Sequence, residues 1–324
     1  MRNCSATCLL IALCFTACQS PESTDGTTQY PDDSFVVPDG GDARFARDSG
    51  PSVGIDEAHH NYHTAEDKYR SFANLLTNDG YRVGRFTELF SAESLREIDV
   101  LVISNALSEE KEFDWTLPTP PAFTSTEVSA VQAWVRAGGR LLLIADHMPF
   151  PGAAAELAKA FGIVFYDAFA YSPSSWDNHE SQLVFSKEDG LLANHTVTSS
   201  AGGGDVPFVV TFTGQAFRML SGVVYAPLIS FADDAFLLLP STADGFDQNV
   251  ARVSAAGLLQ GALIEHGSGR VAVFGEAAMF SAQIQERADG PYPFGMNNSE
   301  APHNARFLLN VMGWLTATHE LIAN

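Results

Sequence analysis

The sequence predicts an α/β fold built on a doubly wound, mostly parallel sheet that carries a β-rich insertion. Short apolar runs alternate with segments of helical periodicity from residue 51 to about residue 170, and the alternation returns after about residue 245. Strands that alternate with helices of about 10–15 residues form right-handed βαβ units, whose helices cover both faces of a parallel sheet. The hydrophobic content of 46% in 324 residues is enough to fill the core of such a domain.

The first half of the domain contains five expected strands and three expected helices. The strands are 52–58, 81–86, 99–106, 140–146 and 163–169. The helices are 64–80, 124–139 and 152–162. Tyr69, Phe72 and Leu76 recur at helical spacing in the first helix, and a Thr/Ser cap opens the second. These elements supply the parallel part of the sheet.

The second half begins with a segment of different character. Residues 171 to about 245 lack a helical period and contain β-rich runs separated by Gly, Ser and Asp. We expect hairpins here that extend or cover the sheet. A strand, a turn about Gly267 and a further strand follow, and "HNARFLLNVMGWLTA" is a strongly apolar final helix. Residues 51–318 are therefore expected to form one domain with an insertion.

Residues 1–18 have the features of a bacterial export signal. Arg2 precedes an apolar run at 9–15, which is shorter than the about 20 residues of a membrane-spanning helix. "FTAC" resembles the lipobox of bacterial lipoproteins, in which the cysteine is acylated and becomes the mature N-terminus. We therefore expect an outer-membrane lipoprotein, facing the periplasm or the exterior, whose lipid anchor on Cys18 makes the membrane a partner. Ordinary secretion is the alternative.

The segment after the signal predicts a tether. Residues 19–50 are rich in Pro, Gly, Ser, Thr and Asp and hold few apolar residues to bury. Such a composition favours disorder. We therefore expect a disordered tether between the anchor and the domain.

Cysteine usage and charge exclude several classes of function. All four cysteines lie in residues 1–18, so cleavage before Cys18 leaves the domain with no disulfide, no thiolate nucleophile and no Cys-ligated metal. The formal net charge of −21, with 18 Lys and Arg against 39 Asp and Glu, would repel a phosphate backbone. Nucleic acid is therefore not an expected partner.

Carboxylates and imidazoles follow several of the expected strands. In an open parallel sheet, ligands bind outside the carboxyl ends of the strands, so these side chains are expected to converge at one edge. The candidate ligand-binding residues are Glu57, His59, His60, Asp146, His147 and Glu276.

A divalent metal such as zinc is a further possibility at this edge. His59 and His63 are spaced i, i+4, which places both imidazoles on one face if the helix has already begun there. The candidate metal ligands are His59, His63, Asp146 and His147. The alternative is that the histidines cap or pack at a helix start and that Asp146 caps the next helix.

Several motifs together suggest a known superfamily. They are "IDEAHHN", "VQAWVRAGGRLLLIAD", "LLANHTVT", "GSGRVAVFGEAAMF" and "NARFLLNVMGWL". Residues 51–318 resemble uncharacterised bacterial domains of the class I glutamine amidotransferase-like superfamily, which is flavodoxin-like. The group is related to ThuA-type proteins and to the amidotransferase-like domains of gliding-motility and intraflagellar-transport proteins. The resemblance implies a fold more than an activity.

The sequence departs from that superfamily at its nucleophile. Class I amidotransferases carry a cysteine at the elbow after the strand that here is expected at 140–146, whereas this chain continues with Asp146, His147 and Met148. Without a thiolate the chain is not expected to be a glutamine amidotransferase.

Two functions remain open at this point. The first is a cell-envelope lipoprotein that binds a glycan, another small polar ligand or a partner at the strand edge. The second is a metal-assisted hydrolase acting on a glycan or an ester, in which a bound zinc would lower the pKa of water to about 7.

We predict that the mature protein begins at an acylated Cys18, because "FTAC" matches a lipobox and a tether-like segment follows it. Mass spectrometry of the mature N-terminus checks this. An unmodified Cys18, or a mature chain that starts elsewhere, would contradict it.

Overall fold

The computed structural model describes residues 28–38, 43–173, 182–243 and 249–317. The expected signal peptide, Cys18 and the first part of the expected tether lie outside the described residues. No helix among the described residues is both long enough and apolar enough to cross a bilayer.

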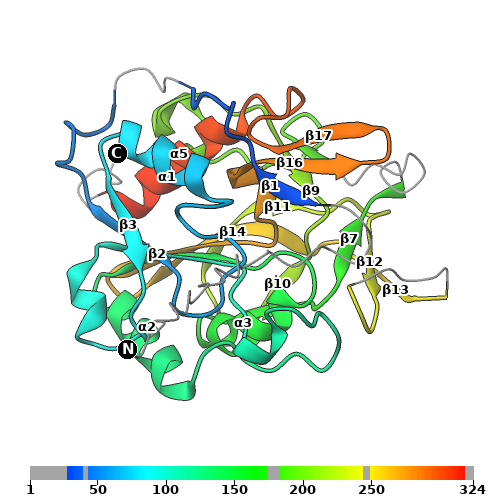
Figure 1. The fold of residues 1–324 in the computed structure, drawn as a ribbon, viewed down its shortest axis with the longest axis horizontal. Helices are drawn as coiled ribbons and strands as arrows, with labels where there is room; N and C mark the ends of the chain where they lie inside the picture. The colour runs from blue at the N-terminus through cyan, green and yellow to red at the C-terminus, as the bar shows by residue number, and fades with distance from the viewer. Residues whose placement is uncertain (1–27, 39–42, 174–181, 244–248, 318–324) are drawn as a thin grey trace, which may run out of the picture.

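A nine-stranded mixed sheet runs through the centre of the molecule (Figure 1). One side of it is parallel, in the order β3–β2–β4–β5–β15. These strands are β3 (Arg82–Phe86), β2 (Ser52–Asp56), β4 (Val100–Ser104), β5 (Arg140–Ile144) and β15 (Gly269–Phe274). All the carboxyl ends of these five strands therefore lie along one edge.

The other side of the sheet is antiparallel, so the prediction of a mostly parallel sheet was too simple. β14 pairs with β15, β11 and β10, and β10 pairs with β6. The strands are β14 (Leu259–His266), β11 (Tyr225–Ser230), β10 (Phe217–Met219) and β6 (Ile163–Phe165). The tight turn at Gly267, whose φ is +64°, forces β14 and β15 to run in opposite directions. Strands added beyond β14 continue that antiparallel pattern.

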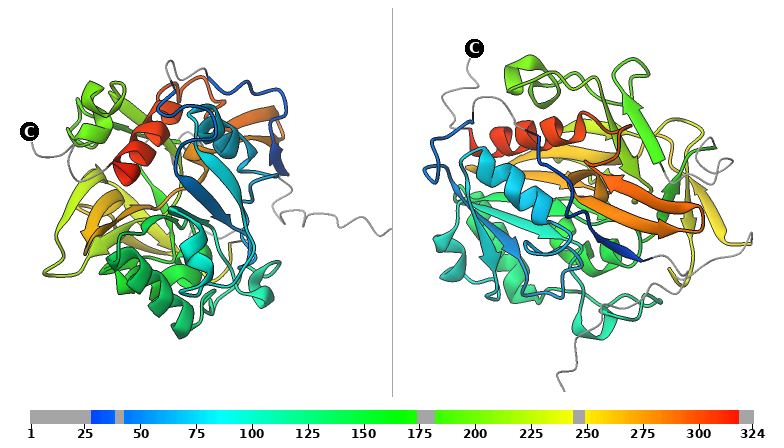
Figure 2. Two further views of the ribbon diagram at one scale, coloured as in Figure 1. Left: turned by 90° about the vertical axis from the view of Figure 1, so that its left-hand side faces the viewer. Right: turned by 45° about the horizontal axis from the view of Figure 1, so that its top comes forward.

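Helices cover both faces of the parallel strands. α1 (Arg70–Asn78) and α5 (Asn304–Thr316) pack on one face, and α2 (Ser125–Arg136) and α3 (Phe150–Ala160) pack on the other. The two pairs lie above and below the sheet in Figure 1, and both views of Figure 2 keep them apart. β4 is buried along its whole length, since its alternate side chains point into the two different cores.

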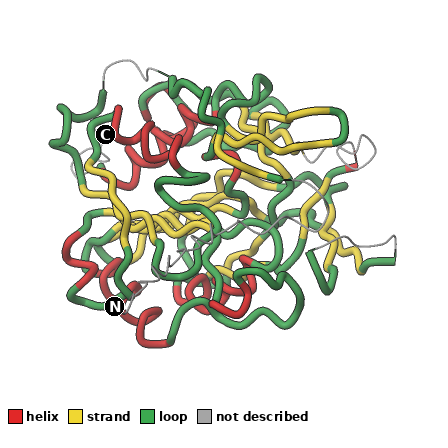
Figure 3. Tube along the Cα trace, in the orientation of Figure 1, coloured by secondary structure: helices red, strands yellow, loops and turns green. Residues whose placement is uncertain are grey.

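Three smaller sheets surround the main one, and Figure 3 shows their strands in yellow away from the central sheet. They are β1 (Gln29–Pro31)–β16 (Ala282–Arg287)–β17 (Gly290–Gly295), β13 (Ala251–Ser254)–β12 (Phe236–Leu239)–β7 (Phe169–Tyr171), and β8 (Gln182–Ser186)–β9 (Phe208–Phe212). Short 3-10 helices are η1 (Ser94–Glu97), η2 (Glu109–Lys111), η3 (Thr196–Thr198), η4 (Ser200–Gly202) and η5 (Ala278–Phe280).

The expected helix at 64–80 begins later than predicted. α1 begins at Arg70, and residues 57–69 form bends and turns after β2. The predicted cap of α2 is present: the backbone N–H of Glu127 donates to Thr124 Oγ1, and the Glu127 carboxylate accepts from Thr124.

The expected disordered tether, 19–50, is ordered where the structure describes it. β1 pairs with the edge strand β16, and Phe45 contacts Tyr81 edge-to-face at 5.0 Å between ring centroids. Phe35 and Val37 also pack against the core. The few apolar side chains of this segment therefore bury enough surface to hold it on the domain, which composition averaged over the whole segment did not reveal.

Candidate functional site

A pocket of about 270 Å³ lies beyond the carboxyl ends of β4 and β5. This is where ligands bind to open parallel sheets. Its main polar lining residues are His63, Asn105, Asp146, His147, Gln283 and Gln285. Its aromatic lining residues include Tyr62, Trp115, Phe150, Phe169, Tyr171 and Phe294.

Asp146 is held rigidly at the floor of the pocket. Its carboxylate accepts backbone hydrogen bonds from His147 at 2.7 Å and from Ala277 at 3.3 Å. Its own N–H donates to Asn105 Oδ1 at 2.9 Å, which joins the ends of β4 and β5. Burial raises the pKa of the Asp146 carboxyl above its ordinary value. A buried carboxyl of this kind can act as a hydrogen-bond acceptor or hold a proton.

His147 presents one edge of its ring to the pocket. Nδ1 lies 2.7 Å from the carbonyl oxygen of Met148. Because a carbonyl oxygen only accepts hydrogen bonds, Nδ1 carries the proton and donates it to that oxygen. The ring stacks on Phe169 with centroids 4.4 Å apart and planes 15° apart. The stacking and the hydrogen bond fix the direction of Nε2.

His63 is buried in the same wall. Its Nδ1 lies 3.3 Å from Ser104 Oγ, and its ring centroid lies 4.6 Å from that of Tyr69. Burial lowers the pKa of His63 well below 6.5, and the charges of Lys68 and His147 act in the same direction. His63 is therefore a neutral imidazole at pH 7.

Glu276 lies behind the pocket, fully buried and outside its lining. Its two oxygens accept backbone hydrogen bonds from Ala278 at 2.7 Å and Met279 at 2.8 Å. Burial and the neighbouring Asp146 carboxylate raise its pKa well above the ordinary value. Glu276 therefore binds the first backbone N–H groups of η5 and does not line the pocket.

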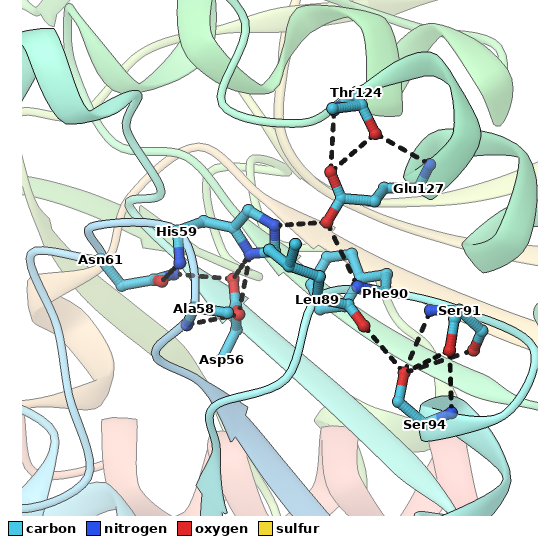
Figure 4. A network of polar contacts seen from close by, with 10 residues as sticks. All are labelled: Asp56, Ala58, His59, Asn61, Leu89, Phe90, Ser91, Ser94, Thr124 and Glu127. Atoms are coloured by element: carbon cyan, nitrogen blue, oxygen red, sulfur yellow. Dashed lines mark hydrogen bonds and ion pairs between the residues drawn. The ribbon is translucent and has the colours of Figure 1, made fainter.

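His59 belongs to a buried network away from the pocket (Figure 4). Nδ1 lies 3.0 Å from both carboxylate oxygens of Asp56, and Nε2 lies 2.9 Å from Glu127 Oε1. Both ring nitrogens face carboxylates that only accept hydrogen bonds, so both donate and the ring is an imidazolium. Burial lowers the pKa of His59, but Asp56 and Glu127 raise it by more, and the pKa lies above 6.5.

The two remaining candidates also point elsewhere. Glu57 accepts from Ala65 N–H and pairs with Arg85 at 2.6 Å. His60 is partly exposed and pairs with Glu112 at 3.0 Å. The structure thus brings Asp146 and His147 together with His63, places Glu276 behind them, and separates Glu57, His59 and His60 from them. The prediction that all the candidate residues converge at one edge was wrong, because the loop after β2 turns its side chains in different directions.

The expected metal site is not assembled. His59 and His63 lie in the turns before α1, so their i, i+4 spacing does not put them on one helical face. Among the residues that the structure describes, no three His, Cys, Asp or Glu side chains gather as metal ligands.

Much of the pocket wall was not predicted from the sequence. Gln283 and Gln285 come from β16, far from most of the parallel strands in sequence, and no local signal marks them. Asn105 directly follows β4, so the strand-end rule could have found it. Asn105 and Thr213, both in the lining, have positive φ values of 54° and 72°. Such strained backbone is often found at functional sites.

Comparison with known proteins shows the fold. No protein-family model and no curated protein matches this chain. The N-terminal domain of mmIFT52 has a TM-score of 0.58 at 13% identity, over 82% of this chain and 98% of that domain. A protein from Bacteroides uniformis described as ThuA-like has a TM-score of 0.42 at 14% identity, over 82% of this chain and 90% of its own. For a protein from Thermoplasma acidophilum described as part of a GMP synthase, the TM-score is 0.36 at 12% identity, over 81% of this chain and 92% of its own.

The first of these similarities shows that the chain shares the fold of the mmIFT52 N-terminal domain. The fold and the pocket together define the class: a mixed α/β protein with few helices and a small pocket at the carboxyl edge of its parallel strands.

We predict that His59→Asn destabilises the fold by about 3–5 kcal/mol, because it leaves two buried carboxylates without their cation. Urea unfolding followed by circular dichroism checks this. The matched control is His60→Asn, at an exposed ion pair, which should cost less than about 1 kcal/mol. Equal effects of the two substitutions would show that the buried network around His59 does not hold the fold.

The stabilisation by His59 should depend on pH. Its folded pKa lies above the unfolded value of 6.5, so its contribution is complete below pH 6.5 and is lost as the pH rises through the folded pKa. Glu127 behaves in the opposite way. Burial raises the pKa of its carboxyl, but hydrogen bonds from Thr124 and His59 lower it by more, so the contribution of Glu127 to stability is present above pH 4.5 and is lost in acid. Because His59 loses its charge as the pH rises, the difference in unfolding free energy between wild type and His59→Asn should shrink from pH 6 to pH 9. A constant difference over that range would contradict the charged state of His59.

Proposed function

We propose that the pocket binds a small, neutral, hydroxylated ligand such as a monosaccharide. The observation that supports this most is the composition of the wall, in which aromatic rings lie beside amide, imidazole and carboxyl groups. Aromatic faces pack against apolar C–H surfaces, while fixed polar groups bind hydroxyls and set orientation. A sugar ring offers both kinds of surface.

The charges of the lining favour a neutral ligand. No Lys or Arg lines the pocket among the described residues. The carboxylic acid in its lining is Asp146. An anionic ligand would have to give up its hydration beside that carboxyl without a cation to replace it. Hydroxyl groups avoid this penalty, because they donate to and accept from Asn, Gln and carboxyl groups.

The size of the pocket favours a small ligand. Its volume of about 270 Å³ lies just below the range of about 300–1,000 Å³ that is typical of sites for drug-sized molecules. A single sugar ring suits this volume better than a long glycan does.

The proposed setting is the cell envelope. On this proposal the domain is a class I amidotransferase-like, flavodoxin-like unit without a cysteine nucleophile, and an acylated Cys18 anchors it to the outer membrane. The strand order β3–β2–β4–β5–β15 and the helix pairs on both faces support the flavodoxin-like assignment. A metal-assisted hydrolase has less support, since the described residues hold no cluster of metal ligands.

Isothermal titration calorimetry with glucose, galactose and N-acetylglucosamine tests the proposal. At least one sugar should give a saturable signal, and Trp115→Leu should weaken its binding about two- to tenfold by removing an aromatic face. Trp134→Leu is the matched control, because Trp134 lies on α2 outside the pocket. Binding of none of the sugars, or equal weakening by both substitutions, would refute the proposal.

A further inference from the structure

Gln283 holds an unusual position in the wall of the pocket. It lies on β16, the central strand of a three-stranded sheet, between Pro31 of β1 and Phe294 of β17. Its side chain is 1% exposed, yet its Oε1 atom has no hydrogen-bond partner. Its backbone carbonyl accepts from Asn297 at 2.8 Å, so the residue is held on both strand edges and at its carbonyl.

The orientation of the Gln283 amide follows from its neighbours. Ser281 Oγ donates its hydrogen to the carbonyl oxygen of Ala278 at 2.9 Å. With the hydroxyl in this orientation, the same oxygen accepts from the Gln283 amide nitrogen, 2.7 Å away, which places Nε2 toward Ser281. Turning the amide over would put two acceptors face to face. Oε1 is therefore the atom left without a partner.

The geometry of His63 is compatible with this orientation of the amide. Its Nε2 lies 3.5 Å from Gln283 Nε2, and its Nδ1 lies beside Ser104 Oγ. A neutral His63 with the proton on Nδ1 donates to Ser104 and turns its Nε2 lone pair toward the amide nitrogen. The amide nitrogen of Gln283 then donates to two acceptors, whereas its amide oxygen accepts from no donor.

An unpaired buried acceptor lowers stability, since its desolvation costs about 1–3 kcal/mol. A group of this kind calls for an explanation in a folded protein. Here the same lining also contains Asn105 and Thr213 in left-handed backbone conformations. An orphaned acceptor and strained backbone in one wall both fit a site whose geometry is set for a ligand.

We propose that Gln283 is the specificity-determining residue of the pocket and that its Oε1 atom accepts a hydrogen bond from one hydroxyl of the ligand. This inference rests on the proposed binding function and goes beyond it, because it names the atom that selects the ligand. The pocket then distinguishes a hydroxyl donor from a group of the same size that cannot donate. Discrimination of this kind is strong, because the wrong ligand leaves the buried acceptor unpaired.

Deoxyfluoro sugars test the inference directly. The probes are the sugar that binds wild type most tightly among glucose, galactose and N-acetylglucosamine, and its analogues in which one hydroxyl is replaced by fluorine, which cannot donate. One analogue should bind wild type at least about tenfold more weakly than the parent. In Gln283→Met the parent should weaken by a similar factor, and the difference between the parent and that analogue should fall below about twofold.

Asn310→Leu is the matched control. Asn310 is also 1% exposed and also has an unpartnered amide oxygen, but it lies on α5 outside the pocket. This variant should keep both the affinity and the discrimination of wild type. Circular dichroism and thermal unfolding establish that each variant is folded. If Gln283→Met does not fold, Gln283→Asn is used as a second, more conservative variant.

The outcomes separate the two proposals. If wild type binds a sugar but Gln283→Met keeps the full discrimination against the fluorinated analogue, the role of Gln283 is wrong and the binding function stands. If Asn310→Leu loses the discrimination as well, the effect is a general loss of packing and the role of Gln283 is wrong. If none of the sugars binds wild type, the binding function fails and the role of Gln283 fails with it.

Discussion

Burial of the parallel strands on both faces is the constraint on which the rest of the structure depends. β4 and β5 lie between the α1/α5 core and the α2/α3 core, so a polar side chain in the middle of either strand would be cut off from water. Polar groups can therefore appear only where the strands end. Asn105 and Asp146 follow these two ends directly, and the hydrogen bond between them starts the floor of the pocket.

The loop between β2 and α1 shows how neighbouring histidines come to have different roles. Asp56 and Glu127 hold His59 as a buried cation and thereby fasten the loop to the start of α2. The chain then turns, and His63 enters the pocket wall as a neutral ring. The Tyr69 hydroxyl donates to the carbonyl oxygen of Ala277 at 3.0 Å and ties the end of this loop to the segment after β15. One histidine stabilises the loop so that the other can face the pocket.

Strands outside the main sheet complete the wall of the pocket at the strand edge. An open parallel sheet leaves its carboxyl edge as a crevice, whereas here β16 adds Gln283 and Gln285 to the wall. β1, from the segment before the domain, pairs with β16 and adds Gln29 to the same wall. The N-terminal segment is therefore part of the site and not merely a connection to it.

The sequence by itself determined the alternating elements, the cap of α2, the turn at Gly267 and the positions of Asp146 and His147 after β5, because periodicity, capping and strand ends are local properties of the chain. Only the tertiary structure decided the antiparallel half of the sheet, the late start of α1 and the separation of His59 from His63. It also decided that Gln283 lines the pocket. These features depend on pairings between residues far apart in sequence, such as His59 with Glu127 and β1 with β16, and on burial that changes the chemistry of each group. No local pattern records which distant residue will satisfy a hydrogen bond or leave it open for a ligand.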